Sequence, residues 1–427
     1  MTARYIVGDV FDALAKLPDA SVDLVMTSPP FLALRSYLPK DHPDKAKEIG
    51  SEPTPGEYLD TLLDVIEALE RVLAPHGSIV VELGDTYSGS GGAGGDYTPA
   101  DPSNGTWAMR AGQPTFDGSA TKARAARAKP MNTAYNQPGA GERTGPGRTR
   151  SDRDGWPLDK SKVLVPELFA VALSYGFNAL TGRQTDRWRV RNVVAWCRPN
   201  PPVGALSDKF RPATSYLTIA CKSRTRYFDM DAVRTEAVDQ RFRTTNGPKH
   251  GDPVEVQTAN YQTRVPSHPA GAPPLDYWVI PTEPYKGSHY AAFPSDLCVT
   301  PIEAMCPRRV CTVCGEPSRR LVEHVNSTGN GHRTLGDPQR HARAGSSTDA
   351  PDFSERLTLG WSDCGHDSWR NGVVLDPFAG SGTTLAVATG HGRDAIGIDL
   401  DERNAELGRQ RVGMWLVEIE YPEVAHA

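Results

Sequence analysis

The sequence predicts an α/β fold built on a doubly wound, mostly parallel sheet. Short apolar runs that end in Asp or Pro recur along the chain and alternate with segments of helical periodicity, an alternation that is typical of βα units. A glycine-rich turn and a proline-rich turn each follow one of these runs, as turns do at the carboxyl edge of such a sheet. With 427 residues, 38% hydrophobic and 23% charged, the chain can bury a sizeable core.

Seven strands and four helices make up the predicted pattern. The strands are expected at residues 5–10, 22–27, 78–83, 192–197, 216–220, 373–375 and 395–398. The clearest helix lies between the second and third strands, where apolar residues from Tyr58 to Leu73 keep i, i+3, i+4 spacing between Pro55 and Pro75. Further helices fit residues 164–175, 383–389 and 402–417.

Composition and charge exclude the membrane and secreted classes. No apolar run approaches the roughly 18 residues of a membrane span, and the first residues form a strand pattern without the apolar core of a signal peptide. Seven cysteines, an odd number, without an export signal indicate a reducing, cytoplasmic compartment. The net charge of −5 neither requires nor excludes nucleic acid, because local basic patches decide phosphate binding.

Two polar stretches interrupt the pattern. Residues 88–160 are rich in Gly, Ala, Ser, Thr, Pro and Arg, and residues 121–153 carry eight basic side chains against two acidic ones. A solvated disordered insertion explains this composition, and so does a flexible basic arm that orders on a polyanion. The second stretch, residues 326–351, is expected to be a loop.

The strongest local motif is the glycine-rich turn at residues 373–384. An apolar strand runs into Asp376, and Gly380 and Gly382 then turn the chain tightly into a helix, which leaves room for a ligand beside the backbone. The turn lacks the Lys of a P-loop and the third glycine of a dinucleotide fingerprint. About twenty residues further on, Asp399 ends a second strand, where a carboxylate would hold a ribose hydroxyl pair.

The second motif is the turn at residues 22–31, where a strand stops at Pro29 and Pro30. Neither proline donates a ladder hydrogen bond, so the chain leaves the sheet, and the Ser28 and Pro29 carbonyls are expected to point outward beside the Ser28 hydroxyl and the Phe31 ring. Such a pocket suits a planar ring with an exocyclic amine, since acceptors take the N–H hydrogens while Phe31 stacks. The acceptors would favour a pyramidal nitrogen in line with an electrophilic methyl group. A strand-ending turn with a packing Phe is the alternative interpretation.

Cysteine spacing predicts a metal site near the C-terminal third. Cys311 and Cys314 form a knuckle followed by glycine, and Cys364 and His366 follow fifty residues later. Together they would give a tetrahedral Cys3His zinc site, structural because no position is left open for water. Cys306 is an alternative fourth ligand, and plain structural thiols are the alternative to zinc. The other cysteines, Cys197, Cys221 and Cys298, stand in apolar contexts typical of core residues.

The two turns together resemble those of amino-group DNA methyltransferases dependent on S-adenosylmethionine, in the permuted (beta) class and its cytosine-N4 subgroup. Residues 27–31 resemble the family's Ser/Asp/Asn-Pro-Pro-Tyr/Phe motif, and residues 376–384 resemble its cofactor motif. Residues 192–202 resemble its Trp-x-Lys-x-Asn strand, with Arg198 in place of the usual Lys. The resemblance, which extends to residues 71–85 and 289–294, implies a Rossmann-like methyltransferase fold with circularly permuted motif order.

The resemblance also implies roles for individual residues. Ser28, Pro29 and Phe31 would hold the target base, with Pro30 shaping the turn. Asp399 would take the ribose hydroxyls, Asp9 the adenine amine and Thr383 the carboxylate, while His289, Phe293 and Pro294 either close the methionine side or pack. The full set of cofactor-binding residues implied is Asp9, His289, Phe293, Asp376, Phe378, Gly380, Gly382, Thr383 and Asp399.

The implied reaction is site-specific methyl transfer from S-adenosylmethionine to the exocyclic N4 of cytosine in DNA. Serine at position 28 favours cytosine, and adenine N6 is the first alternative. A non-catalytic DNA-binding protein with this fold is the second, and protein or RNA methylation a weaker one. A target in duplex DNA would have to be flipped out of the stack at about a few kcal/mol. The absence of a nuclease motif favours a stand-alone methylase, or one with a separate restriction endonuclease as its partner, in a prokaryotic or phage setting.

These interpretations divide the chain into functional regions. Residues 1–87 are expected to form the catalytic half with the base pocket, 88–160 a flexible basic insertion, and 161–204 the rest of the catalytic core. Residues 205–275 carry many Lys and Arg side chains and are expected to recognise the DNA target. Residues 276–427 would form the cofactor-binding half, with the zinc knuckle inserted at 306–370.

Overall fold

The computed structural model describes residues 1–33, 37–39, 41–88, 155–158, 160–201, 209–235, 271–283, 293–326 and 354–421. The strands are β1 (Ala3–Val7), β2 (Val22–Thr27), β3 (Leu73–Leu83), β4 (Arg189–Cys197), β5 (Thr214–Cys221), β6 (Tyr277–Val279), β7 (Arg309–Cys311), β8 (Arg320–Asn326), β9 (Ser354–Trp361), β10 (Trp369–Asn371), β11 (Val373–Asp376), β12 (Asp394–Asp399) and β13 (Leu416–Glu420). The α-helices are α1 (Val10–Lys16), α2 (Pro55–Val72), α5 (Val165–Tyr175), α6 (Asp296–Met305), α7 (Thr383–Gly390) and α8 (Arg403–Val412). Three 3₁₀ turns are η1 (Lys45–Lys47), η4 (Met230–Ala232) and η6 (Gly413–Trp415).

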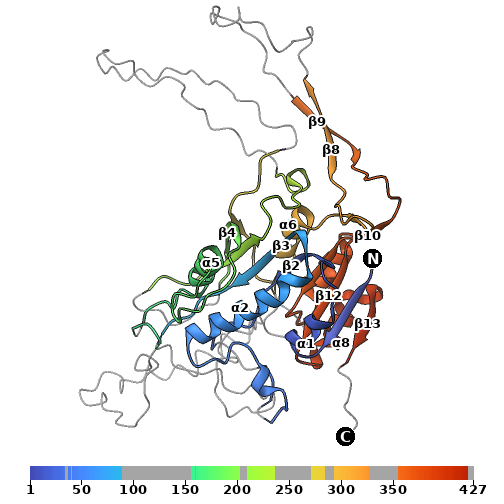
Figure 1. Ribbon diagram of the computed structural model, residues 1–427. Helices are drawn as coiled ribbons and strands as arrows, with labels where there is room; N and C mark the ends of the chain where they lie inside the picture. The colour runs from blue at the N-terminus through green and yellow to red at the C-terminus, as the bar shows by residue number, and fades with distance from the viewer. Residues whose placement is uncertain are drawn as a thin grey trace, which may run out of the picture.

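Nine strands form one sheet in the order β13-β1-β12-β11-β2-β3-β5-β4-β6 (Figure 1). Among the described strands of this sheet, β5 alone pairs antiparallel with its neighbours, β3 and β4. The others run in one direction, so that β2, near the start of the chain, pairs in parallel with β11, near its end. The predicted mostly parallel α/β sheet is therefore confirmed. None of the described helices is long and apolar enough to cross a membrane.

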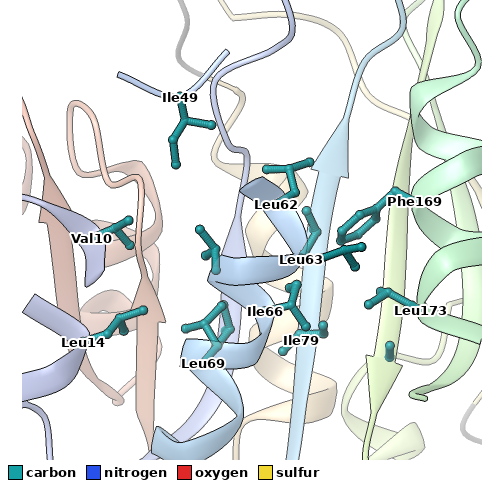
Figure 2. Close-up of a cluster of buried hydrophobic side chains, with 14 of the residues drawn as sticks. Val10, Leu14, Ile49, Leu62, Leu63, Ile66, Leu69, Ile79, Phe169 and Leu173 are labelled. Carbon is teal, nitrogen blue, oxygen red and sulfur yellow. The ribbon is translucent and has the colours of Figure 1, made fainter. Parts of the chain in front are cut away.

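Each face of the sheet is covered by helices, as a doubly wound fold requires. On one face α1, α2 and α5 pack against alternate residues of β2 and β3, and Figure 2 shows Leu63 and Ile66 of α2 between Leu14 of α1 and Phe169 of α5. On the other face α6, α7 and α8 pack over a second cluster that contains Tyr5 and Leu24. The two clusters arise because successive side chains of a strand point to opposite faces.

Local sequence signals account for most element boundaries. The strand predicted at residues 22–27 matches β2, and α2 begins at a capping box in which Thr54 accepts from the Glu57 N–H while the Glu57 carboxylate accepts from the Thr54 N–H. The strand predicted to reach Val10 ends instead at Val7, because Asp9 caps α1 by accepting from Phe11 N and Asp12 N.

The predicted helix at residues 402–417 is wrong in its last part. Helix α8 ends at Val412, η6 follows, and the chain then enters β13. Strand β13 pairs with β1, the first strand of the chain, and adds an edge to the sheet. This pairing depends on a partner more than 400 residues away in sequence, so the local periodicity did not reveal it.

A buried ionic cluster fixes the amino edge of the sheet. Asp23 of β2 is fully buried and contacts His76 Nε2 at 2.9 Å, Arg370 Nη2 at 3.1 Å and Val373 N at 2.7 Å. Burial alone would raise the pKa of Asp23, but hydrogen bonds from His76 and Arg370 outweigh it and hold the pKa below its ordinary value. The ionised carboxylate thereby ties β2 to the segment that enters β11.

Candidate functional site

A cleft opens at the carboxyl ends of the central parallel strands. Its walls are formed by residues 8–10 after β1, Ser28 and Pro30 after β2, residues 377–381 and Thr383 after β11, and residues 399–401 at the end of β12. Gly382, an expected cofactor-binding residue, does not line it. Ligands of open α/β sheets bind at this edge, outside the strand ends. Both turns singled out in the sequence therefore meet at one cleft.

The glycine-rich turn has a tightly fixed backbone. Gly380 donates its N–H to Asp399 Oδ2 at 2.8 Å, and its carbonyl accepts a 2.6 Å hydrogen bond from the hydroxyl of buried Tyr5. Gly382 has φ of 76°, and a Cβ there would lie 3.1 Å from the Gly408 Cα. Glycine at 382 thus allows α7 and α8 to pack closely, while Gly380, Phe378 and Thr383 line the cleft.

Asp376 lies beneath the cleft and is not among the residues that line it. Its carboxylate is 1% exposed and accepts hydrogen bonds from Thr27 Oγ1 and Thr384 Oγ1, both at 2.6 Å, and from Phe378 N at 3.1 Å. Burial raises the pKa of Asp376 to about 6. Since Thr27 directly precedes Ser28, Asp376 connects the two turns; its expected contact with a cofactor stays a prediction.

Asp399 presents a carboxylate to the cleft at the end of β12. Besides Gly380 N, it accepts hydrogen bonds from Asp401 N at 2.9 Å and from Asn404 Nδ2 at 3.0 Å. Burial raises its pKa to about 6, against the lowering effect of these donors. Asp9 and Phe293 also line the cleft, although Asp9 is at the same time the cap of α1. His289 lies outside the described residues.

The Ser-Pro-Pro turn is held by two buried side chains from neighbouring elements. Ser28 donates its hydroxyl to Glu82 Oε2 at 2.6 Å, and the Pro30 carbonyl accepts a 2.8 Å hydrogen bond from the Tyr58 hydroxyl of α2. Glu82, in β3, is 2% exposed. Burial raises the pKa of Glu82, although the hydroxyls of Ser215 and Ser28 and the positive charge of Arg198 lower it in part.

The sequence interpretation missed Glu82. A single carboxylate inside the apolar run of residues 79–83 was the available signal, because a charged residue in a buried strand requires a partner. The structure supplies that partner as Ser28, 54 residues away.

The other two residues of the turn lie differently. Pro29 is buried. The Phe31 ring packs on Gly84, where a Cβ would lie only 2.5 Å from the ring, and it borders a small second pocket with Thr86 and Val165. Stacking of Phe31 on a base therefore stays a prediction.

The predicted metal ligands come together at the other edge of the sheet. The ligand atoms of Cys311, Cys314, Cys364 and His366 all lie within 4.8 Å of one another. Cys306, the alternative fourth ligand, is fully buried outside this group, with its Sγ 3.8 Å from the Pro307 carbonyl.

The fold and the cleft define a class: open α/β proteins with a ligand-sized cleft at the carboxyl edge of a parallel sheet. Within that class, the profile of the DNA methylase family that modifies N6 or N4 positions matches residues 22–309 and 365–410. The chain belongs to this DNA methylase family.

Two type II methyltransferases agree with the family assignment by sequence. The chain is 24% identical over 411 residues to the type II methyltransferase M.SmaI of Serratia marcescens, covering 96% of this chain and 91% of that protein. It is 26% identical over 290 residues to M.Cfr9I of Citrobacter freundii, covering 68% of each. Among solved structures, the cytosine-N4-specific PvuII DNA methyltransferase aligns with a TM-score of 0.43 at 12% identity, covering 98% of this chain and 95% of that chain.

Proposed function

We propose that this protein is a site-specific DNA methyltransferase that transfers a methyl group from S-adenosylmethionine to the exocyclic N4 of cytosine. The observation that carries the proposal is the Ser28 hydroxyl, oriented by buried Glu82 and lining the same cleft as the glycine-rich turn and Asp399. Serine rather than Asp or Asn at this position favours cytosine. Adenine N6 methylation by the same turn is the alternative.

The cleft residues fit S-adenosylmethionine, which supplies an electrophilic methyl group when bound. The open backbone at Gly380 admits a ligand, and Asp399 offers a carboxylate to ribose hydroxyls. Asp9, which lines the cleft, would accept from an adenine amine, and Phe293 and Phe378 would supply apolar walls. A carboxylate at the end of a strand, next to a glycine-rich turn, is the usual arrangement for holding a nucleoside.

The chemistry required of Ser28 follows from its hydrogen bond. An exocyclic amine is a poor nucleophile because its lone pair is delocalised into the ring. Since Ser28 donates its proton to Glu82, its oxygen lone pairs remain available to accept an N–H of the amine. The charge on Glu82 strengthens that acceptor and favours a pyramidal nitrogen. The methylated amine then loses its extra proton to water, so no general base is needed.

The remaining assignments are part of the same proposal. The target base would be flipped out of duplex DNA. Residues 205–275 would contribute to target recognition, and residues 88–160 would form a flexible basic insertion. The type II relatives favour a restriction-modification setting in the cytoplasm, with a separate endonuclease. A structural zinc ion at the Cys3His cluster takes no part in methyl transfer.

The test is methyl transfer from labelled S-adenosylmethionine to unmethylated DNA, followed by nucleoside digestion and mass spectrometry. The expected product is 4-methylcytosine. Detection of 6-methyladenine instead would keep the enzyme class but overturn the base assignment. Cofactor binding without any methylated nucleoside, over a panel of DNA sequences, would favour a non-catalytic DNA-binding protein.

A further inference from the structure

One internal segment of the chain lies outside the family match, and the β8–β9 hairpin that it contains is called the arm. The match stops at residue 309 and resumes at residue 365. In between, β8 and β9 pair antiparallel, from Arg320 opposite Trp361 to Asn326 opposite Ser354, and the hairpin extends away from the main sheet (Figure 1). The chain leaves for the arm at β7 and returns at β10, and these two strands pair with Cys311 opposite Trp369.

The four metal-type side chains stand where this arm begins and ends. Cys311 and Cys314 lie on the outgoing segment, and Cys364 and His366 lie on the returning one. Cys311 Sγ lies 3.6 Å from His366 Nδ1. A tetrahedral zinc ion, with Zn–S of about 2.3 Å and Zn–N of about 2.0–2.1 Å, separates a sulfur and a nitrogen ligand by about 3.6 Å. The Val313 N–H also points at Cys311 Sγ, at 3.4 Å, which favours a thiolate.

Packing in the core does not explain Cys314 and Cys364. Cys221, Cys298 and Cys306 are fully buried, as structural cysteines usually are, whereas Cys314 is exposed and Cys364 half-buried. A disulfide would use two of the three clustered sulfurs and leave the third, together with the imidazole, unexplained. Three sulfurs and one imidazole nitrogen within 4.8 Å of one another are a donor set typical of zinc.

We propose that Cys311, Cys314, Cys364 and His366 bind one Zn²⁺ ion that clamps the base of the arm onto the catalytic domain. The ion joins two segments separated by about fifty residues. Its four coordinate bonds offset the entropic cost of closing this loop. The proposal is independent of which base is methylated.

Two ion pairs show what the clamp holds in place. Arg320 at the start of β8 donates to Asp229 Oδ1 at 3.1 Å and to Asp229 Oδ2 at 2.9 Å, and Asp229 N donates to the Ala304 carbonyl of α6. On the returning side, Arg370 of β10 reaches the buried Asp23. The metal ligands lie before the amino end of β11, whereas the glycine-rich turn that lines the cleft follows its carboxyl end. Loss of the ion should therefore free the arm and lower stability while leaving cofactor binding intact.

The experiment measures zinc in the full-length protein by inductively coupled plasma mass spectrometry, with Co²⁺ substitution as a spectroscopic readout. We expect one zinc ion per chain and a thiolate-to-cobalt charge-transfer band, both lost in Cys364→Ser. Cys314→Ser, at an exposed side chain, repeats the test where folding is not endangered. Cys197→Ser, a half-buried thiol outside the cluster, is the matched control and should keep its zinc.

Chelation completes the test. Removing the metal should expose the arm to limited proteolysis, re-adding Zn²⁺ should protect it, and the affinity for S-adenosylmethionine should be unchanged in calorimetry. Wild-type protein purified without zinc, or Cys314→Ser and Cys364→Ser both retaining it, would overturn the proposal. So would a free-thiol count reduced by two under non-reducing conditions in zinc-free protein, since this would indicate a disulfide.

Discussion

Replacing Ser28 by Ala tests the base pocket directly, because it removes the oxygen proposed to accept the amine proton. A hydrogen bond that involves a charged group contributes about 1.5–3 kcal/mol, and the Ser28 oxygen is polarised by the Glu82 carboxylate at 2.6 Å. If that acceptor acts on the reacting amine, Ser28→Ala should lower turnover roughly 10- to 150-fold. Cofactor affinity should stay nearly unchanged, because Ser28 directly follows β2 and most of the expected cofactor contacts come from the turns after β11 and β12.

The assay compares initial methyl-transfer rates with cofactor Kd from calorimetry. Ser21→Ala is the matched control, since its hydroxyl contacts only the Pro18 carbonyl on a turn before β2. Stability must be followed in parallel, because the variant deprives the buried Glu82 of its hydroxyl donor, at a cost of about 1–3 kcal/mol. Equal losses of turnover and cofactor affinity, or wild-type turnover, would refute the assignment of Ser28 to the base pocket.

Glu82→Gln separates orientation from charge. The amide oxygen can still accept the Ser28 proton, so the hydroxyl keeps its direction but loses the effect of the negative charge. Because burial raises the pKa of Glu82, wild-type turnover should fall as the pH drops through that raised value. The variant should be slower at neutral pH and should lack this acidic limb. An unchanged pH–rate profile would indicate that Glu82 is only a structural partner.

Further predictions concern the cofactor side and the amino edge of the sheet. Asp399→Ala should weaken cofactor affinity before it affects catalysis. Since burial raises the pKa of Asp399 to about 6, the affinity of the wild type measured by calorimetry should decrease below about pH 6, and the variant should lack this dependence. A purely catalytic defect would contradict the ribose role. Arg370→Met removes the guanidinium from the buried Asp23 and should lower the free energy of unfolding by about 3–5 kcal/mol in urea titrations. Arg409→Met, in an exposed ion pair, should change it by less than about 1 kcal/mol. Similar losses in both variants would contradict a stabilising role of the buried pair. Because the pKa of Asp23 is lowered on folding, the wild-type advantage should be full at neutral pH and disappear as the pH falls below about 4.

Much of the fold was predictable because its signals are local. Apolar runs bounded by turn residues located the seven predicted strands, and helical periodicity located α2, α5 and α7. The same signals did not locate α1, which has seven residues, α6, which contains Pro301, or the strands β6 to β10 and β13. A strand at the edge of a sheet is decided by the strand beside it, and for β13 that strand is β1, at the opposite end of the chain.

The candidate site divides in the same way. The sequence by itself determined where the two turns lie and which residue types they offer, because prolines and glycines constrain the backbone within a few residues. Only the tertiary structure decided how the carboxylates are used: Asp376 is occupied by Thr27 and Thr384, whereas Glu82 is directed at Ser28. The role of a buried charge depends on the partner that reaches it, and here these partners come from strands brought together only by the parallel pairing of β11, β2 and β3.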